Sequence, residues 1–249
     1  MKRNIHFWYL KRDATALVCE TENVRQRVAS LFPYKKTYTV PNTCASVFRE
    51  NHLLGEGSHR LKHSDRFRLL TVTRYYPHKN LNIIKSVIAE LEKRGKAEGV
   101  QFVLTIDKDD YQRVFGNGYE DSVVTVGAVP LNEVPDLYRA CDAAFLPTLL
   151  ECYSANYPEA MSIGLPILTS DLGFARTVCH EAALYFDPLN AEDIATKIVK
   201  IAEDETLRNQ LKEAGVKRLQ EFPNAHERAL KYLEICSMLA KANRNDNVP

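Results

Sequence analysis

The sequence predicts an α/β protein built around a Rossmann-like, doubly wound parallel sheet. Six short apolar runs between residues 67 and 186 alternate with stretches of helical periodicity. Regular alternation of strand and helix is typical of a parallel sheet covered by helices on both faces. The expected strands are residues 67–73, 100–106, 123–129, 143–147, 166–170 and 183–186.

A shorter α/β piece precedes this sheet. Residues 16–21 predict a strand, residues 22–31 a helix, and residues 36–40 a second strand that ends at Pro41 and Asn42. This pattern predicts a partial amino-terminal βαβ segment, because strands of this type pair across an intervening helix.

The remaining segments complete a division into four parts. Residues 43–66 contain Gly55 and Gly57 among many charges and have little apolar periodicity, which predicts a linker after a first part at residues 1–42. A complete domain is expected at residues 67–222. Residues 223–249 are expected to form a terminal helix, over 224–241, and a frayed polar tail, over 243–249.

Composition excludes several classes of protein. The net charge of +1 lacks the basic excess of a nucleic-acid-binding surface. The chain contains neither an 18-residue apolar run nor a signal-peptide pattern. Its six cysteines show no Cys-x2-Cys spacing, which favours reduced thiols and a cytoplasmic location. Residues 1–12 mix basic and aromatic side chains, and they predict either a domain remnant or a peripheral contact with the inner membrane face.

Two glutamates mark the first candidate site. Glu151 and Glu159 are eight residues apart where the strand at 143–147 should turn into a helix. Pro158 is tolerated in the first turn of a helix, so Glu151 should lie in the loop and Glu159 near the helix start. Open α/β sheets bind ligands at this edge, and ionised carboxylates accept hydroxyl donors. The position of the pair predicts a polyol ligand, whereas the spacing alone favours the alternative of two solvated helix carboxylates.

Two cations mark the neighbouring strand. Arg74 and Lys79 lie five residues apart, directly after the strand expected at 67–73. Fixed cations at a strand end suit a diphosphate. The alternative is a pair of ordinary solvated loop cations, because exposed Lys and Arg are common.

Together these segments resemble the carboxyl-terminal, donor-binding domain of retaining GT-B glycosyltransferases of the glycosyl transferases group 1 family. The resemblance covers residues 67–222. It is carried by the Arg-x4-Lys and Glu-x7-Glu spacings and by the following segments: Val126-Gly-Ala-Val129-Pro130, Leu137-Tyr-Arg-Ala-Cys-Asp142 and Pro166-Ile-Leu-Thr-Ser-Asp171. It implies that residues 1–42 end an acceptor-side domain and that most of the acceptor pocket lies outside this chain.

The resemblance also implies a role for each candidate residue. Arg74 and Lys79 would hold the diphosphate and Glu151 the hydroxyls of the transferred sugar, so these three are the expected catalytic residues. Further donor-binding positions are implied as follows: Glu159 for the ribose, Val129 and Pro130 beside the base, and Tyr153, Ser154 and Ala155 along the donor.

The sequence departs from the family pattern at two donor-site elements and in its length, because 249 residues are expected to be too few for two complete Rossmann-like domains. Thr73 stands where the family usually has Gly before the Arg, and Cys152-Tyr153-Ser154 replaces the usual Gly-Phe-Gly after the first Glu. Side chains therefore occupy positions where bare backbone normally approaches the donor. Many relatives carry Glu at the position of Thr177.

The implied function is transfer of a sugar from a nucleotide-diphosphate sugar to a sugar or lipid-linked acceptor, in the synthesis of a cell-surface polysaccharide or glycoconjugate. The reaction would be retaining and would use neither a metal nor another cofactor. The alternative is a catalytically incomplete nucleotide-sugar-binding or interaction module whose interdomain face is covered by a partner chain or a second copy. A sugar-nucleotide epimerase is a third hypothesis.

Three further patterns suggest other sites. Asp107-Lys-Asp109-Asp110 imitates a metal-binding acidic motif but is better explained as a helix N-cap. His52, His59 and His63 fall in the expected linker and favour a solvated loop over a metal site. No Gly-x-Gly-x-x-Gly follows the first strand of the complete domain, which disfavours a dinucleotide-binding dehydrogenase.

Overall fold

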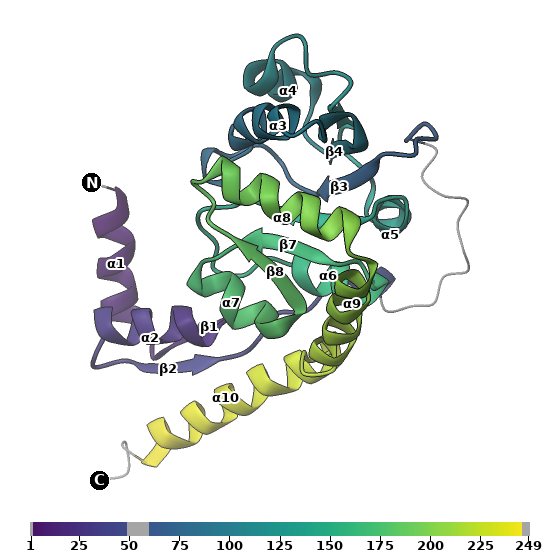
Figure 1. Ribbon diagram of the computed structural model, residues 1–249. Helices are drawn as coiled ribbons and strands as arrows, with labels where there is room; N and C mark the ends of the chain where they lie inside the picture. Colours follow the sequence, from purple (N-terminus) through teal and green to yellow (C-terminus); the bar gives the residue numbers. More distant parts are fainter. Residues whose placement is uncertain (1, 49–59, 246–249) are drawn as a thin grey trace. The chain divides into compact units, whose positions relative to one another are not determined.

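The computed structural model describes residues 2–48 and 60–245 and divides the chain into two compact units (Figure 1). Unit 1 comprises residues 1–43 and 222–249, and unit 2 comprises residues 44–221. His52 and His59 of the expected linker lie outside the described residues. The assignment of acceptor-side and donor-side roles to these parts stays a prediction.

Unit 2 is built on a six-stranded parallel sheet, which confirms the predicted α/β fold class. The strand order is β5-β4-β3-β6-β7-β8, and every neighbouring pair is parallel. The strands are β3 (Phe67–Thr71), β4 (Val100–Leu104), β5 (Val123–Thr125), β6 (Ala143–Leu146), β7 (Ile167–Ser170) and β8 (Ala183–Phe186). Numbered within this unit, the order is 3-2-1-4-5-6, which is the Rossmann order.

Several strands end earlier than expected, each at its carboxyl end. β3 stops at Thr71 because the backbone N–H of Thr73 donates to the side chain of Thr105 at 2.8 Å and not to a neighbouring strand. β5 stops at Thr125, and Gly127 with a φ of 70° turns the chain two residues later. Thr73, Thr105 and Ile106 are buried in the loops after β3 and β4, whereas residues 126–129 after β5 are half-buried or exposed.

Helices pack on the sheet and close the core. They are α3 (Ile83–Lys93), α4 (Lys108–Phe115), α5 (Val134–Arg139), α6 (Asn156–Ile163), α7 (Gly173–Cys179), α8 (Ala191–Glu203) and α9 (Glu205–Leu219). α3 and α8 pack together, and their apolar faces join strand residues such as Leu69 and Phe145 in one buried cluster. Asp107 caps α4 by accepting from the backbone of Asp110 at 2.7 Å, as the sequence predicted.

Unit 1 contains the predicted βαβ segment. β1 (Ala16–Cys19) pairs in parallel with β2 (Lys36–Thr39), and α2 (Glu22–Leu31) connects them. The unit also contains α1 (Lys2–Asp13) and α10 (Ala225–Asn245). α10 continues to Asn245, past the helix end expected at residue 241, and residues 246–249 of the expected polar tail lie outside the described part.

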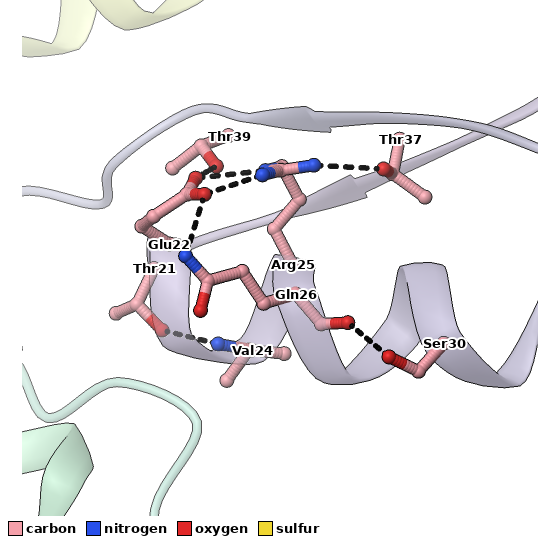
Figure 2. A network of polar contacts seen from close by, with 8 residues as sticks. All are labelled: Thr21, Glu22, Val24, Arg25, Gln26, Ser30, Thr37 and Thr39. Carbon is pink, nitrogen blue, oxygen red and sulfur yellow. Dashed lines mark hydrogen bonds and ion pairs between the residues drawn. The ribbon is translucent and has the colours of Figure 1, made fainter.

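A polar network fastens α2 to β2 (Figure 2). The Glu22 carboxylate accepts hydrogen bonds from Arg25 Nε at 2.8 Å and from the hydroxyl of Thr39 on β2, also at 2.8 Å. The other end of the Arg25 guanidinium donates to Thr37 at 3.3 Å. These donors, Arg25 first, lower the pKa of Glu22 from 4.5 to about 2. Unit 1 is therefore held together partly by an ionised carboxylate.

None of the six cysteines forms a disulfide bond, and four of them are buried. Within residues 2–48 and 60–245, no helix is both long and apolar enough to cross a bilayer.

We predict that the Glu22 network makes unit 1 sensitive to acid. Because the folded pKa is depressed, the contribution is fully present above pH 4.5 and is lost as the pH falls toward 2. Glu22→Gln should remove at most about 1 kcal/mol at pH 7, since exposed ion pairs are screened, and should matter little near pH 2. Unfolding followed by the fluorescence of Trp8, the single tryptophan and part of unit 1, measures the difference.

Glu213→Gln on α9 provides the matched control, because this exposed carboxylate belongs to unit 2. A stability difference between wild type and Glu22→Gln that stays constant from pH 7 to pH 2 would contradict the prediction.

Candidate functional site

The site forms where the loops after β3 and β6 are fastened to each other. The backbone N–H of Leu149 donates to the carbonyl of His78 at 2.7 Å, and the Thr148 hydroxyl donates to the same carbonyl at 3.2 Å. Asn156, the first residue of α6, donates its side-chain amide to the carbonyl of Val72 at 2.7 Å. β3 and β6 flank the point where the strand order reverses, which is where open α/β sheets bind ligands.

Lys79 and Glu151 meet across these two loops. Lys79 Nζ donates to Glu151 Oε1, and the two side chains are only 20% and 15% exposed. Lys79 ends the short helix η2 (Pro77–Lys79), and Asn80 follows it with a φ of 58°. The Asn80 amide donates to the carbonyl of Pro188 at 2.8 Å, which fixes this left-handed turn and with it the position of Lys79.

The pocket around this ion pair is nearly filled. Its lining includes Lys79, Glu151, Ser154 and Thr73, and it encloses only about 10 Å³. A cavity of that size is at the lower limit for a single water molecule. A ligand that uses either charge must therefore separate Lys79 from Glu151.

Arg74 occupies a different environment from Lys79. Its side chain is exposed, and within residues 2–48 and 60–245 the guanidinium makes no hydrogen bond or ion pair. It does not line the pocket that contains Lys79 and Glu151. The structure therefore brings one of the two predicted cations into the pocket and leaves the other at its exterior, where it can meet an anion without losing a partner.

Glu159 is buried near the start of α6. Pro158 and Glu159 both lie in the first turn or immediately after it, as the sequence predicted. Glu159 is 9% exposed and accepts a hydrogen bond from the Tyr138 hydroxyl at 3.0 Å. Burial raises the pKa of Glu159, and the bond from Tyr138 works against that rise. One carboxylate oxygen is thus occupied by a neutral donor inside the protein.

Three residues with structural roles at the site were missed by sequence reasoning. Tyr138 donates to Glu159 and packs edge-on against Phe48, with ring centroids 5.5 Å apart. Thr105 accepts from the Thr73 N–H and donates to the Thr73 carbonyl at 2.9 Å, which clamps the β3 loop. Asn156 joins the two loops. Of these three, Thr105 alone carried a local signal, as a polar residue directly after β4, and that signal does not identify its partner.

The other predicted positions are spread along the loops. Ser154 is buried and lines the pocket, whereas Tyr153 and Ala155 are half-buried and do not. Val129 and Pro130 lie between β5 and the short helix η4 (Leu131–Glu133), outside the pocket lining. The structure thus groups Lys79, Glu151 and Ser154 in one pocket.

The chemistry at the site is that of hydrogen-bonding groups and fixed charges. Within residues 2–48 and 60–245, no cluster of three or more His, Cys, Asp or Glu side chains is arranged to hold a metal ion. Thr73 turns its hydroxyl to the carbonyl of Arg74 at 2.7 Å, so this departure from Gly is absorbed within its own loop.

Comparison with known proteins identifies the family. The model of the family described as glycosyl transferases group 1 matches residues 58–218. The chain belongs to this family. Over 106 residues it is 33% identical to the mannosylfructose-phosphate synthase of Agrobacterium fabrum, covering 42% of this chain and 23% of that protein.

A second curated relative aligns with more of the chain. The phosphatidylinositol N-acetylglucosaminyltransferase GPI3 subunit of Saccharomyces cerevisiae is 21% identical over 216 residues, covering 83% of this chain and 47% of that protein. The glycosyltransferase chain thus spans less than half the length of both curated relatives.

A solved structure supports the fold. The α,α-trehalose 6-phosphate synthase from Burkholderia multivorans superposes with a TM-score of 0.77 at 13% identity, covering 100% of this chain and 64% of that one. The likeness confirms the predicted GT-B fold.

We predict that Tyr138→Phe destabilises the protein in a pH-dependent way. At pH 7 the variant leaves a buried carboxylate without its donor, which costs about 1–3 kcal/mol. Because burial already raises the pKa of Glu159, acidification protonates this group in the folded state and should reduce the loss. Urea unfolding at pH 7 and at pH 4.5 measures the loss at each pH.

Tyr119→Phe is the control, since Tyr119 is a half-buried tyrosine of the same unit outside this pair. An equal loss for Tyr138→Phe at both pH values would show that the hydroxyl does not act through Glu159.

Proposed function

We propose that this chain is the donor-binding part of a glycosyltransferase that uses a nucleotide-diphosphate sugar. The observation that carries the proposal is the Lys79–Glu151 pair at the switch point between β3 and β6. A cation that suits phosphate and a carboxylate that suits sugar hydroxyls lie side by side there, and a diphosphate sugar presents both groups in adjacent positions.

The proposed chemistry assigns each charge a separate task. Lys79 and the exposed Arg74 stabilise the negative charge that develops on the leaving diphosphate. Glu151, released from Lys79 by that diphosphate, accepts hydroxyls of the transferred sugar. Glu159 holds the ribose through its second carboxylate oxygen while Tyr138 occupies the first. The reaction proposed is retaining, and it relies on these side chains without a metal or other cofactor.

The remaining proposed donor contacts come from the loops after β6 and β5. Ser154 in the pocket, with Tyr153 and Ala155 beside it, faces the sugar and phosphates. Val129 and Pro130 follow β5 and border the base. The side chains of Cys152 and Ser154 occupy the room that the family's two glycines would leave, so they contribute to the choice of donor sugar.

The proposed acceptor is a sugar or a lipid-linked sugar, in the synthesis of a cell-surface polysaccharide or glycoconjugate in the cytoplasm. Support comes from the GPI3 relative, whose name describes transfer of N-acetylglucosamine to phosphatidylinositol. Cysteines without disulfide bonds are consistent with a reducing compartment. A peripheral position at the inner membrane face is the related proposal for the basic and aromatic helix α1.

A second candidate function is favoured by exposed apolar side chains in unit 1. Trp8 and Tyr9 of α1 are 52% and 48% exposed, and Leu31 of α2 is 60% exposed. Apolar groups gathered in this way are typical of surfaces that bind a partner. An interaction module that binds a nucleotide sugar and joins a partner chain or a second copy would use this surface.

We predict that Arg74→Ala and Lys79→Ala each weaken binding of a nucleoside diphosphate about tenfold or more. Charge-assisted hydrogen bonds contribute about 1.5–3 kcal/mol, and about 1.4 kcal/mol corresponds to tenfold. Binding of the bare nucleoside should change little. Calorimetric titration of UDP, GDP and ADP and of their nucleosides measures both.

Lys212→Ala, an exposed cation on α9, is the matched control. Unchanged diphosphate affinity in both site variants would show that Arg74 and Lys79 are ordinary loop cations, and the proposed function would lose its main support.

We predict that Glu159→Gln and Glu151→Gln change ligand affinity in different ways. Glu159→Gln should weaken a nucleoside diphosphate and its sugar conjugate alike, by about 1–3 kcal/mol for poorly paired ribose hydroxyls. Glu151→Gln should leave the affinity for the nucleoside diphosphate unchanged or raise it, because the Glu151 carboxylate no longer competes with the diphosphate for Lys79. It should also erase the additional affinity for the sugar conjugate.

Titration of both ligands against both variants decides the assignment. Circular dichroism confirms that the variants are folded. Identical binding profiles for Glu151→Gln and Glu159→Gln would reject the separate roles.

A further inference from the structure

A second hollow lies at the carboxyl ends of β7 and β8. It has a volume of about 630 Å³, within the range of pockets that hold small molecules. Asp171, the first residue after β7, and Asp187, the first residue after β8, both line it. None of the site residues predicted from the sequence lines this hollow, and its volume is far larger than the 10 Å³ of the pocket that contains Lys79.

One wall of the hollow is fixed by an arginine. Arg176 of α7 donates to both carboxylate oxygens of Asp171, at 2.6 and 2.7 Å. Its guanidinium also lies over the Tyr185 ring, 3.7 Å from the centroid. A planar cation held on both sides is ordered before a ligand arrives, which lowers the entropic cost of binding.

The other polar groups of the hollow keep unused acceptor capacity. Asp187 accepts from the backbone of Leu189 at 2.9 Å, and Asp193 accepts from the backbone of Asp187 at 2.8 Å. An ionised carboxylate has about four acceptor positions, so most positions on both groups remain for hydroxyl donors. The bond from Arg176 lowers the pKa of Asp171, which keeps that group ionised near neutral pH.

The composition of the lining favours an uncharged polyol. Three carboxylates face two cations, Arg176 and Lys197, so the local charge does not favour a phosphorylated ligand. Leu149 and Leu189, which are 36% and 74% exposed, add apolar surface at the rim. Sugars present both hydroxyl donors and apolar C–H faces, and they match this mixture.

The hollow also adjoins the donor site. Leu149 on its rim is two residues before Glu151, and Pro188 in its lining accepts the hydrogen bond that fixes Asn80 beside Lys79. Across the sheet, the proposed base contacts follow β5, the phosphate contacts β3 and the sugar contacts β6. β7 and β8 come next in this order, on the side of the transferred sugar.

We propose that this hollow binds the acceptor as an uncharged, hydroxyl-rich sugar, which it holds through Asp187, Asp171 and Asp193. The inference rests on the proposed glycosyltransferase function and adds a substrate class to it. It places part of the acceptor contact within unit 2, whereas the sequence implied an acceptor pocket that lies mostly outside this chain.

The test is a binding experiment on the full chain. Methyl α-mannoside, N-acetylglucosamine and sucrose are titrated by protein NMR with UDP or GDP present, and mannose 6-phosphate and glucose 6-phosphate are titrated in parallel. At least one uncharged sugar should shift resonances of residues around Asp187 and Leu189. Asp187→Asn, which keeps an acceptor for the Leu189 N–H, and Leu189→Trp, which fills the hollow, should each weaken that sugar about tenfold.

Two control variants locate the binding. Glu213→Gln and Lys212→Ala, both at exposed positions on α9, should leave the affinity for the sugar unchanged. A sugar affinity that falls in Lys79→Ala but not in Asp187→Asn would place the sugar in the donor pocket and overturn the inference. Preference for the sugar phosphates would overturn the proposed class.

The same titrations separate this inference from the proposed function. Nucleoside diphosphate binding without binding of any uncharged sugar would overturn the acceptor site and leave the donor site standing. Absence of both would overturn the two together.

Discussion

The ion pair between Lys79 and Glu151 is the contact on which the site depends. Removing two charges from water costs several kcal/mol per ion, and their attraction offsets this only with good geometry. Here that geometry is supplied by the loops, which are tied together through His78, Asn156 and Asn80. An apolar pair would stabilise such a junction equally well. The charges are therefore better explained by the ligand they can bind than by the stability they contribute.

Glu151 and Glu159 are eight residues apart across a strand-to-helix turn, and this separation places the two carboxylates in different surroundings. Glu151 faces a cation in a partly exposed pocket, whereas Glu159 is buried against the neutral hydroxyl of Tyr138. The pKa of Glu159 is raised by burial. Carboxylates in such different surroundings serve different tasks, and perturbed groups of this kind gather at functional sites.

Much of this architecture could be predicted because its signals are local. Apolar runs gave the six strands, and Pro158 placed the start of α6. The sequence could not tell that Lys79 turns into the pocket while Arg74 stays exposed, since both are loop cations after the same strand. Nor could it pair Tyr138 with Glu159, because that contact depends on how α5 packs on α6. The orientation of Lys79 and the partner of Glu159 depend on contacts between elements, which local sequence patterns do not encode.

The closed donor pocket and the open hollow beside it have a joint consequence. A diphosphate that takes Lys79 frees Glu151, and Glu151 lies two residues from Leu149 on the rim of the hollow. If the two proposed sites bind donor and acceptor, a diphosphate that displaces Lys79 leaves the Glu151 carboxylate free near the rim of the hollow. Thermodynamic linkage then requires a mutual effect, so an acceptor that is attracted by the freed Glu151 would tighten donor binding by the same factor. Under these proposals, the order of the strands places the two binding positions side by side, and the Lys79–Glu151 pair couples them.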